Sequence, residues 1–198
     1  MSMNRTEWIT CLATILALAV VGAEAEDDLW LDRPLAGWNT PGADLPPASI
    51  TSDTRATLME RCSLVPHRTT AAEQALYAAG WVPQWHFDRQ ALRGDVEIVA
   101  GVSTATENCE PSELNLFVFV DGDFAGTLSP GAMHFRRDGA IGAVRIVGGD
   151  NVTVEFARYA STDTECCPSS RVRVTFKVDR SGAQPVIVPV SARQVRGQ

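Results

Sequence analysis

The sequence has 198 residues and a formal net charge of −7 at pH 7. This length fits a single domain that buries a sizeable hydrophobic core. The acidic balance argues against nucleic acid or an anionic membrane surface as a partner.

Residues 1–25 have the features of an export signal. A short polar start is followed by the apolar run Ile9 to Val21 and then by the small-x-small triplet Ala23-Glu24-Ala25. The run is shorter than the roughly 20 residues that cross a bilayer, which argues against a retained membrane anchor. The sequence therefore predicts cleavage after Ala25 and a periplasmic or secreted product.

Cys11 raises the alternative of a lipid-modified cysteine. A lipid-modified cysteine sits at the end of the apolar run behind small residues, whereas Trp8-Ile9-Thr10 precede Cys11. We therefore expect a chain that is not lipid-anchored.

Residues 26–50 are predicted to form an extended arm at the start of a single domain that covers residues 26–198. The arm contains four prolines and two tryptophans, a composition that disfavours a helix. Trp30 and Trp38 are expected to hold the arm against the domain.

Two short helices are predicted after the arm, from Ser52 to Cys62 and from Thr69 to Ala79. Thr70 and Glu73 have the spacing of a capping box, and Gly80 provides a stop. The second helix is expected to lie across a sheet.

From Asp95 onward, apolar residues alternate with polar ones, as in strands with one buried face. Short turns such as Asp121-Gly122 join the later runs, which favours antiparallel pairing. The prolines of the last run predict an edge strand. The predicted strands are Val96 to Val102, Glu113 to Val120, Phe124 to Leu128, Ala143 to Val147, Val152 to Tyr159, Arg171 to Val178 and Pro185 to Val190.

These elements predict an α+β fold. We expect one antiparallel sheet of five to seven strands, with one or two helices on one face and disulfide bonds that stabilise the domain.

Four cysteines follow the predicted cleavage site: Cys62, Cys109, Cys166 and Cys167. An even number in an exported chain favours two disulfide bonds. Neighbouring cysteines on extended backbone point to opposite sides, so we expect Cys166 and Cys167 to bond Cys62 and Cys109, one each. A thiolate metal site and a redox-active vicinal pair are the alternatives.

Aromatic residues gather around the polar stretch "GWVPQWHFDRQ". Trp81, Trp85 and His86 are candidates for stacking on sugar rings or for holding a peptide. The alternative is that the tryptophans cover the hydrophobic core.

A second candidate site is a small anion-binding patch that contains Arg136, Asp138 and Arg158. The alternative is that Arg158 pairs with acidic neighbours across the sheet.

No motif assigns a catalytic residue, a cofactor or a metal site. Ser129 lies in "GTLSPG", whose spacing does not match a nucleophile elbow. A dispersed catalytic group built from Glu60, Asp138 and His134 or His86 remains an alternative.

Four stretches together resemble the LppP/LprE lipoprotein family of small exported bacterial envelope proteins. They are "GWVPQWHFDRQALRGDVEIVAGVST", "FVFVDGDFAGTLSPGAM", "RRDGAIG" and "FARYASTDTECCPSS". The resemblance implies an envelope setting and brings no established activity. We therefore expect a monomeric, non-catalytic envelope protein that binds an envelope component or another protein. A periplasmic hydrolase and a secreted inhibitor are the alternatives.

Overall fold

A computed structural model describes residues 29–84 and 92–196. A 3-10 turn, η1 (Trp30–Asp32), precedes two helices and nine strands in this part of the chain. The elements are α1 (Ser52–Arg61), α2 (Ala71–Ala78), β1 (Val82–Gln84), β2 (Leu92–Arg93), β3 (Val96–Ala105), β4 (Pro111–Val120), β5 (Asp123–Thr127), β6 (Ile141–Val147), β7 (Asn151–Arg158), β8 (Ser170–Asp179) and β9 (Val186–Arg196).

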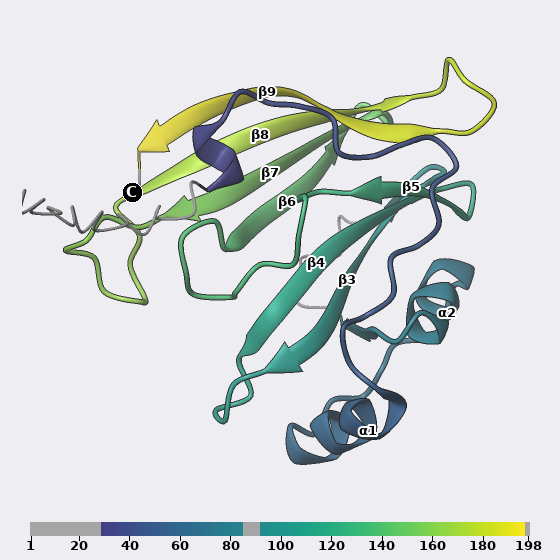
Figure 1. Ribbon diagram of the computed structural model, residues 1–198. Helices are drawn as coiled ribbons and strands as arrows, with labels where there is room; N and C mark the ends of the chain where they lie inside the picture. Colours follow the sequence, from purple (N-terminus) through teal and green to yellow (C-terminus); the bar gives the residue numbers. More distant parts are fainter. Residues whose placement is uncertain (1–28, 85–91, 197–198) are drawn as a thin grey trace, which may run out of the picture.

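The strands form two antiparallel sheets (Figure 1). Sheet A has the order β1-β3-β4-β5, with β2 also paired to β3, and sheet B has the order β6-β7-β8-β9. The α+β class and the antiparallel pairing are therefore confirmed. The prediction of one sheet of five to seven strands was wrong, because the chain leaves sheet A after β5 and begins a second sheet at β6.

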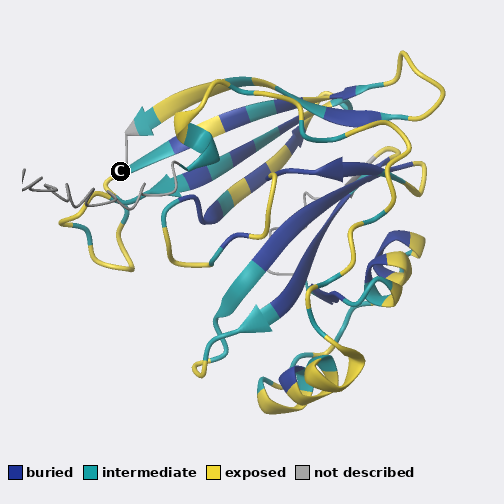
Figure 2. Ribbon diagram, in the orientation of Figure 1, coloured by how far each residue is buried: buried dark blue, intermediate teal, exposed yellow. Residues whose placement is uncertain are grey.

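Sheet A is buried on both faces. Ile98 and Leu116 belong to the core shared with sheet B, whereas Phe117 and Phe119 pack with Leu76 of α2 on the opposite face. Figure 2 shows the result as dark blue along most of β3 and β4, with teal at the ends next to the β3–β4 hairpin. The molecule thus has three layers: sheet B, sheet A and the helices.

Sheet B is buried on one face only. Along β8, Val172, Val174 and Phe176 are buried, while Arg173 and Lys177 between them are exposed. This confirms the alternation that the sequence predicts for the strand.

Both predicted helices are confirmed. The side chain of Thr70 accepts a hydrogen bond from the backbone N–H of Glu73, and Glu73 accepts one from Thr70 N–H, so the capping box is present. Neither helix in the described stretches has the length and apolar character to cross a membrane.

The last strand, β9, is longer than predicted. It lies at the edge of sheet B, as its prolines indicated, but continues beyond Val190 to Arg196. Thr175 and Phe176 of β8 pair with Ser191 and Pro189 of β9, so Val190 between them has no partner in the ladder. The ladder continues on both sides of this register shift. The sequence pattern ended at this irregularity.

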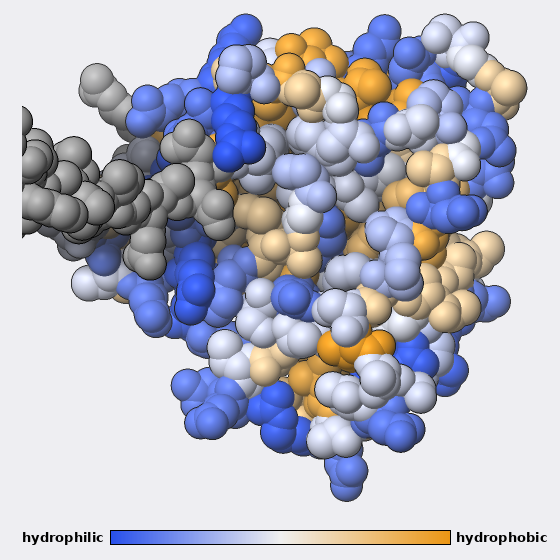
Figure 3. All heavy atoms as spheres, viewed as in Figure 1, coloured by the Kyte–Doolittle hydropathy of each residue, from blue (hydrophilic) through white to orange (hydrophobic). Residues whose placement is uncertain are grey.

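The arm from Leu29 to Ile50 crosses from sheet B past β5 to α1 (Figure 1). Trp30 meets the ring of Phe156 edge-on with centroids 5.1 Å apart, and Trp38 meets Phe176 at 5.9 Å. On this side of the molecule, hydrophobic residues reach the surface in separate patches between polar ones (Figure 3). Through these ring contacts, Trp30 and Trp38 cover the part of the core that β7 and β8 of sheet B contribute.

Asn39 of the arm joins the two sheets. Its side-chain amide donates to the carbonyl oxygens of Thr127 in β5 and Ile187 in β9, both at 2.9 Å. Its Oδ1 accepts from the backbone N–H of Thr127, also at 2.9 Å. Gly126 leaves room for this contact, because a Cβ atom there would lie 2.3 Å from Asn39 Cγ.

We expect Asn39→Ala to lower the free energy of unfolding by about 2 kcal/mol or more, because it leaves buried backbone groups of Thr127 and Ile187 without a partner. Asn151→Ala, at an exposed position, is the control and should change it by less than about 0.5 kcal/mol. Urea unfolding measures both. Equal effects would show that Asn39 does not couple the sheets.

The predicted disulfide pairing was wrong. Cys62 bonds Cys109, with Cα atoms 5.3 Å apart, and Cys166 bonds its neighbour Cys167. Cys62 follows α1 and Cys109 lies in the β3–β4 hairpin, so both belong to the side of the molecule built on sheet A. The vicinal pair lies in the β7–β8 loop of sheet B. Which cysteines bond depends on which loops lie close together in the fold. Cys62 and Cys109 lie on the sheet A side, whereas Cys166 and Cys167 share one loop of sheet B.

The two disulfides should differ in their effect on stability. Cys62 and Cys109 are separated by 47 positions, and closing such a loop in the unfolded chain is worth about 4 kcal/mol in the chain-entropy model. The vicinal bond closes almost no loop. We therefore expect a large loss of unfolding free energy in Cys62→Ser/Cys109→Ser and a small one in Cys166→Ser/Cys167→Ser. Similar losses from both double variants would contradict this account.

A groove beside edge strand β6

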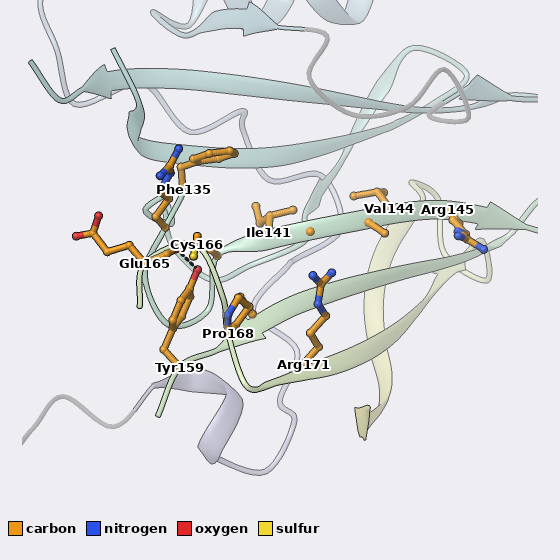
Figure 4. Close-up of a pocket in the computed structure, with 14 residues that line it drawn as sticks. Phe135, Ile141, Val144, Arg145, Tyr159, Glu165, Cys166, Pro168 and Arg171 are labelled. Atoms are coloured by element: carbon orange, nitrogen blue, oxygen red, sulfur yellow. Dashed lines mark hydrogen bonds between the residues drawn. The ribbon is translucent and has the colours of Figure 1, made fainter. Parts of the chain in front are cut away.

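A groove of about 730 Å³ runs along the outer edge of β6. Three segments border it: β6 itself, Phe135 and Arg136 from the β5–β6 connection, and the β7–β8 loop with the start of β8. Figure 4 shows Phe135 on one side of β6, and Tyr159, Pro168 and Arg171 on the other.

Strand β6 is an open edge. It pairs with β7, and within the described residues no strand pairs with its other side. A register shift between Ile141 and Val144 leaves Gly142 and Ala143 outside the ladder. Alternate backbone N–H and C=O groups of such a strand point away from the sheet and can bind another chain.

The β7–β8 loop forms one wall of the groove. The Tyr159 hydroxyl donates to the carbonyl oxygen of Glu165 at 2.8 Å, which closes the loop across its base. Asp163 accepts from the backbone N–H groups of Ala160 and Ser169, both at 2.8 Å, and these bonds lower the pKa of its carboxyl group. The bonded pair Cys166–Cys167 is exposed at the rim.

Three arginines, Arg136, Arg145 and Arg171, border the groove with a single acidic residue, Glu165. The Glu165 carboxylate points away from Arg145 and Arg171 (Figure 4). Arg136 binds Glu110 at 2.8 Å and remains half exposed, with its guanidinium 5.9 Å from the centre of the Phe135 ring. Among the residues that line the groove, basic side chains thus outnumber acidic ones, and Arg145 has no ion pair within the described residues, whereas Arg171 lies 3.7 Å from Glu155.

The phenol of Tyr159 reports on this charge. Burial raises the pKa of Tyr159, and the positive charges of Arg136 and Arg171 act in the opposite direction because they stabilise the phenolate.

Removing one of these arginines should raise the pKa of Tyr159 further. The chain has only two tyrosines, so Tyr77→Phe leaves Tyr159 as the sole phenol. In that background, Arg171→Gln should shift the ultraviolet tyrosinate titration to higher pH, whereas Arg33→Gln, on the arm, should not. An unchanged titration in Arg171→Gln would place Arg171 away from the phenol.

The residues of the predicted anion patch do not all face the groove. Arg136 borders it, whereas Arg158 binds the carboxylates of Asp138 at 3.0 Å and Asp32 at 2.9 Å. Asp138 also accepts from the backbone N–H of Tyr159 at 2.9 Å. Arg158 thus ties β7 to the arm and to the β5–β6 connection. A ligand-binding role for this set of residues stays a prediction.

Of the aromatic candidates, Trp81 is 6% exposed and packs 4.9 Å from the ring of Phe117. Its indole N–H donates to the carbonyl oxygen of Pro46 at 2.9 Å, so it covers the core beneath the arm. Trp85 and His86 lie outside the described residues.

The dispersed catalytic candidates occupy different parts of the fold. Glu60 is on the exposed side of α1, and His134 Nδ1 accepts from the backbone N–H of Arg136 at 3.1 Å. Ser129 is fully buried, and its hydroxyl donates to Asn115 and to the Gly131 carbonyl. In the part of the chain that the structure describes, no three His, Cys, Asp or Glu side chains are placed to hold a metal ion.

Phe135, Arg145, Tyr159 and Arg171 were not predicted as one site. Their proximity depends on β6 being the edge of sheet B and on the loop after β7 folding beside it. Tyr159 and Cys166 did fall in "FARYASTDTECCPSS", a stretch that carries the family resemblance.

This geometry defines an α+β domain with a cationic groove at an open sheet edge. The model of a family described as LppP/LprE lipoprotein matches residues 94–181, somewhat less than half of the chain. The match confirms the resemblance and covers the chain from the start of β3 through β8, including every segment that borders the groove. No curated protein and no solved structure shows significant similarity to the chain.

Proposed function

We propose that this protein is a non-catalytic binding protein of the bacterial cell envelope and that its partner occupies the groove beside β6. The groove carries this proposal, because it combines an open strand edge, exposed aromatic surface and positive charge. Unpaired backbone groups, aromatic rings and arginines are the usual components of binding surfaces.

The walls of the groove are held in place by contacts that do not need a ligand. Asp163 and Tyr159 hold the β7–β8 loop, and Arg158 fixes the end of β7 to Asp138 and Asp32. A site that is formed before binding avoids the entropic cost of ordering it on association. This supports a role in binding.

The similarity to an envelope lipoprotein family supports an envelope address. We further propose that the chain is exported without a lipid anchor, because Cys11 lies inside the apolar run. Metabolic labelling with a fatty acid, followed by mass spectrometry of the exported chain, tests this part. An acylated cysteine at the new N-terminus would overturn it.

A photo-crosslinking amino acid tests the groove. We expect the crosslinker at Phe135, which is 39% exposed, to capture a specific partner in the envelope, and the same crosslinker at Ala56 on the exposed side of α1 to capture none. Arg136→Glu in the Phe135 background should reduce the product, because it reverses a charge at the same wall.

The folding of each variant is checked by its far-ultraviolet circular dichroism. A product of equal yield at both positions, or one that is insensitive to Arg136→Glu, would contradict binding in the groove.

A further inference from the structure

The outer face of sheet B carries a concentration of positive charge on an acidic protein. Residues that alternate with the buried ones point to this face, as Arg173 and Lys177 do on β8. The basic residues of the face are Arg145, Arg171, Arg173, Lys177 and Arg193, and its acidic residues are Glu155 and Asp179. The local balance is opposite in sign to the net charge of −7.

The ladder places these cations close together. Arg173 is directly opposite Arg193 on β9, and Arg171 lies two residues earlier on the same face of β8. Neighbouring strands are about 4.8 Å apart and alternate residues about 7 Å apart along a strand. Several cations of this face therefore lie within reach of one extended anionic chain.

Five cations share two carboxylates on this face, and two of the cations have no acidic partner within the described residues. Glu155 is shared by Arg171 and Arg173, and Asp179 lies near Lys177. No ion pair forms at Arg145 or Arg193, both exposed, among the residues that the structure describes. An incoming anion therefore need not displace an internal carboxylate to reach them.

The face is continuous with the groove. Arg145 and Arg171 belong to the basic face and also border the groove. Arg171 extends across β7 toward the irregularity in β6, where a Cβ atom on Gly142 would lie 3.5 Å from its Nη1. Cationic groups thus follow one path from Arg136 through Arg171 to Arg193.

We infer that this path binds a single chain of an anionic polysaccharide. The inference rests on the proposed function and names the class of partner. Phe135 and Pro168 offer apolar surface on which sugar rings can lie, and arginines suit carboxylate or phosphate groups. A groove of about 730 Å³ that opens onto a flat basic face admits one extended chain.

A planar anionic membrane fits less well. Asp95, Asp121 and Asp150 gather around Arg180 at the end of sheet B where β8 stops. A flat anionic surface that covered the basic face would come near these carboxylates, whereas a flexible chain can leave the face before reaching them.

The test uses the full exported protein and fluorescein-labelled polygalacturonate, with labelled dextran phosphate, labelled neutral dextran and phosphatidylglycerol vesicles as further probes. We expect fluorescence anisotropy to show binding to one or both anionic polymers that weakens with salt, and none to dextran. Preference between the two polymers distinguishes a carboxylate from a phosphate ligand.

The decisive variant is Arg145→Gln/Arg193→Gln, which removes two cations without breaking an ion pair. Its affinity at low ionic strength should fall about 25-fold, roughly fivefold for each cation. Arg33→Gln/Arg68→Gln changes the net charge equally away from the face and should bind as the wild type does. Arg145→Lys/Arg193→Lys should retain most of the affinity.

Three outcomes overturn the inference: no binding to either anionic polymer, an equal loss in the two glutamine variants, or tighter binding to vesicles that depends on Arg145 and Arg193. Crosslinking at Phe135 to a partner that is not an anionic glycan would overturn this inference and leave the proposed function standing.

Discussion

The burial of sheet A on both faces constrains the rest of the structure. One face shares a core with sheet B, and the other is covered by α2 and Trp81, so β3 and β4 can carry almost no polar side chains in their central parts. Buried sheets gain stability from apolar area but offer no surface for recognition. Among the strands that the structure describes, the one broad sheet surface left to solvent is the outer face of sheet B. The placement of the groove and of the basic face there follows from this layering.

The two sheets are closed on one side and open on the other. Between β5 and β9 the amide of Asn39 supplies the hydrogen bonds that a missing ladder would have made, and Trp38 donates to the Thr127 carbonyl beside it. Nothing equivalent covers the free edge of β6 in the described residues, where a register shift and the β7–β8 loop produce a groove. Edge strands are normally protected because they pair readily with other chains. The free edge of β6 borders a groove and is not paired with another described strand, which is consistent with a role in binding.

The sequence predicted most helices and strands. Its hydrophobic patterns also indicated that some strands are buried on both faces and others on one face, although one sheet was expected. "LNLFVFV" in β4 is apolar almost throughout, as in a strand buried on both faces, whereas "RVRVTFKV" in β8 alternates strictly. One sheet does not readily contain both kinds of strand, so this contrast indicated two environments. The disulfide pairing and the ion pair of Arg158 with Asp32 could not be predicted in this way, because they depend on which loops lie close together in the fold. No local pattern encodes that proximity.

The net charge of the protein and the charge of the outer face of sheet B differ in sign. A total of −7 argues against polyanions only if the charges are spread evenly, because charges farther away than a Debye length of about 8 Å are largely screened. Here the strand period places basic side chains on one face, while several carboxylates gather around Arg180 at one end of the sheet. Arg193 lies directly opposite Arg173 on this face, so its neighbour in the ladder has the same sign. The acidic remainder of the surface then acts on specificity, since it repels large anionic surfaces while a single narrow chain still reaches the basic face.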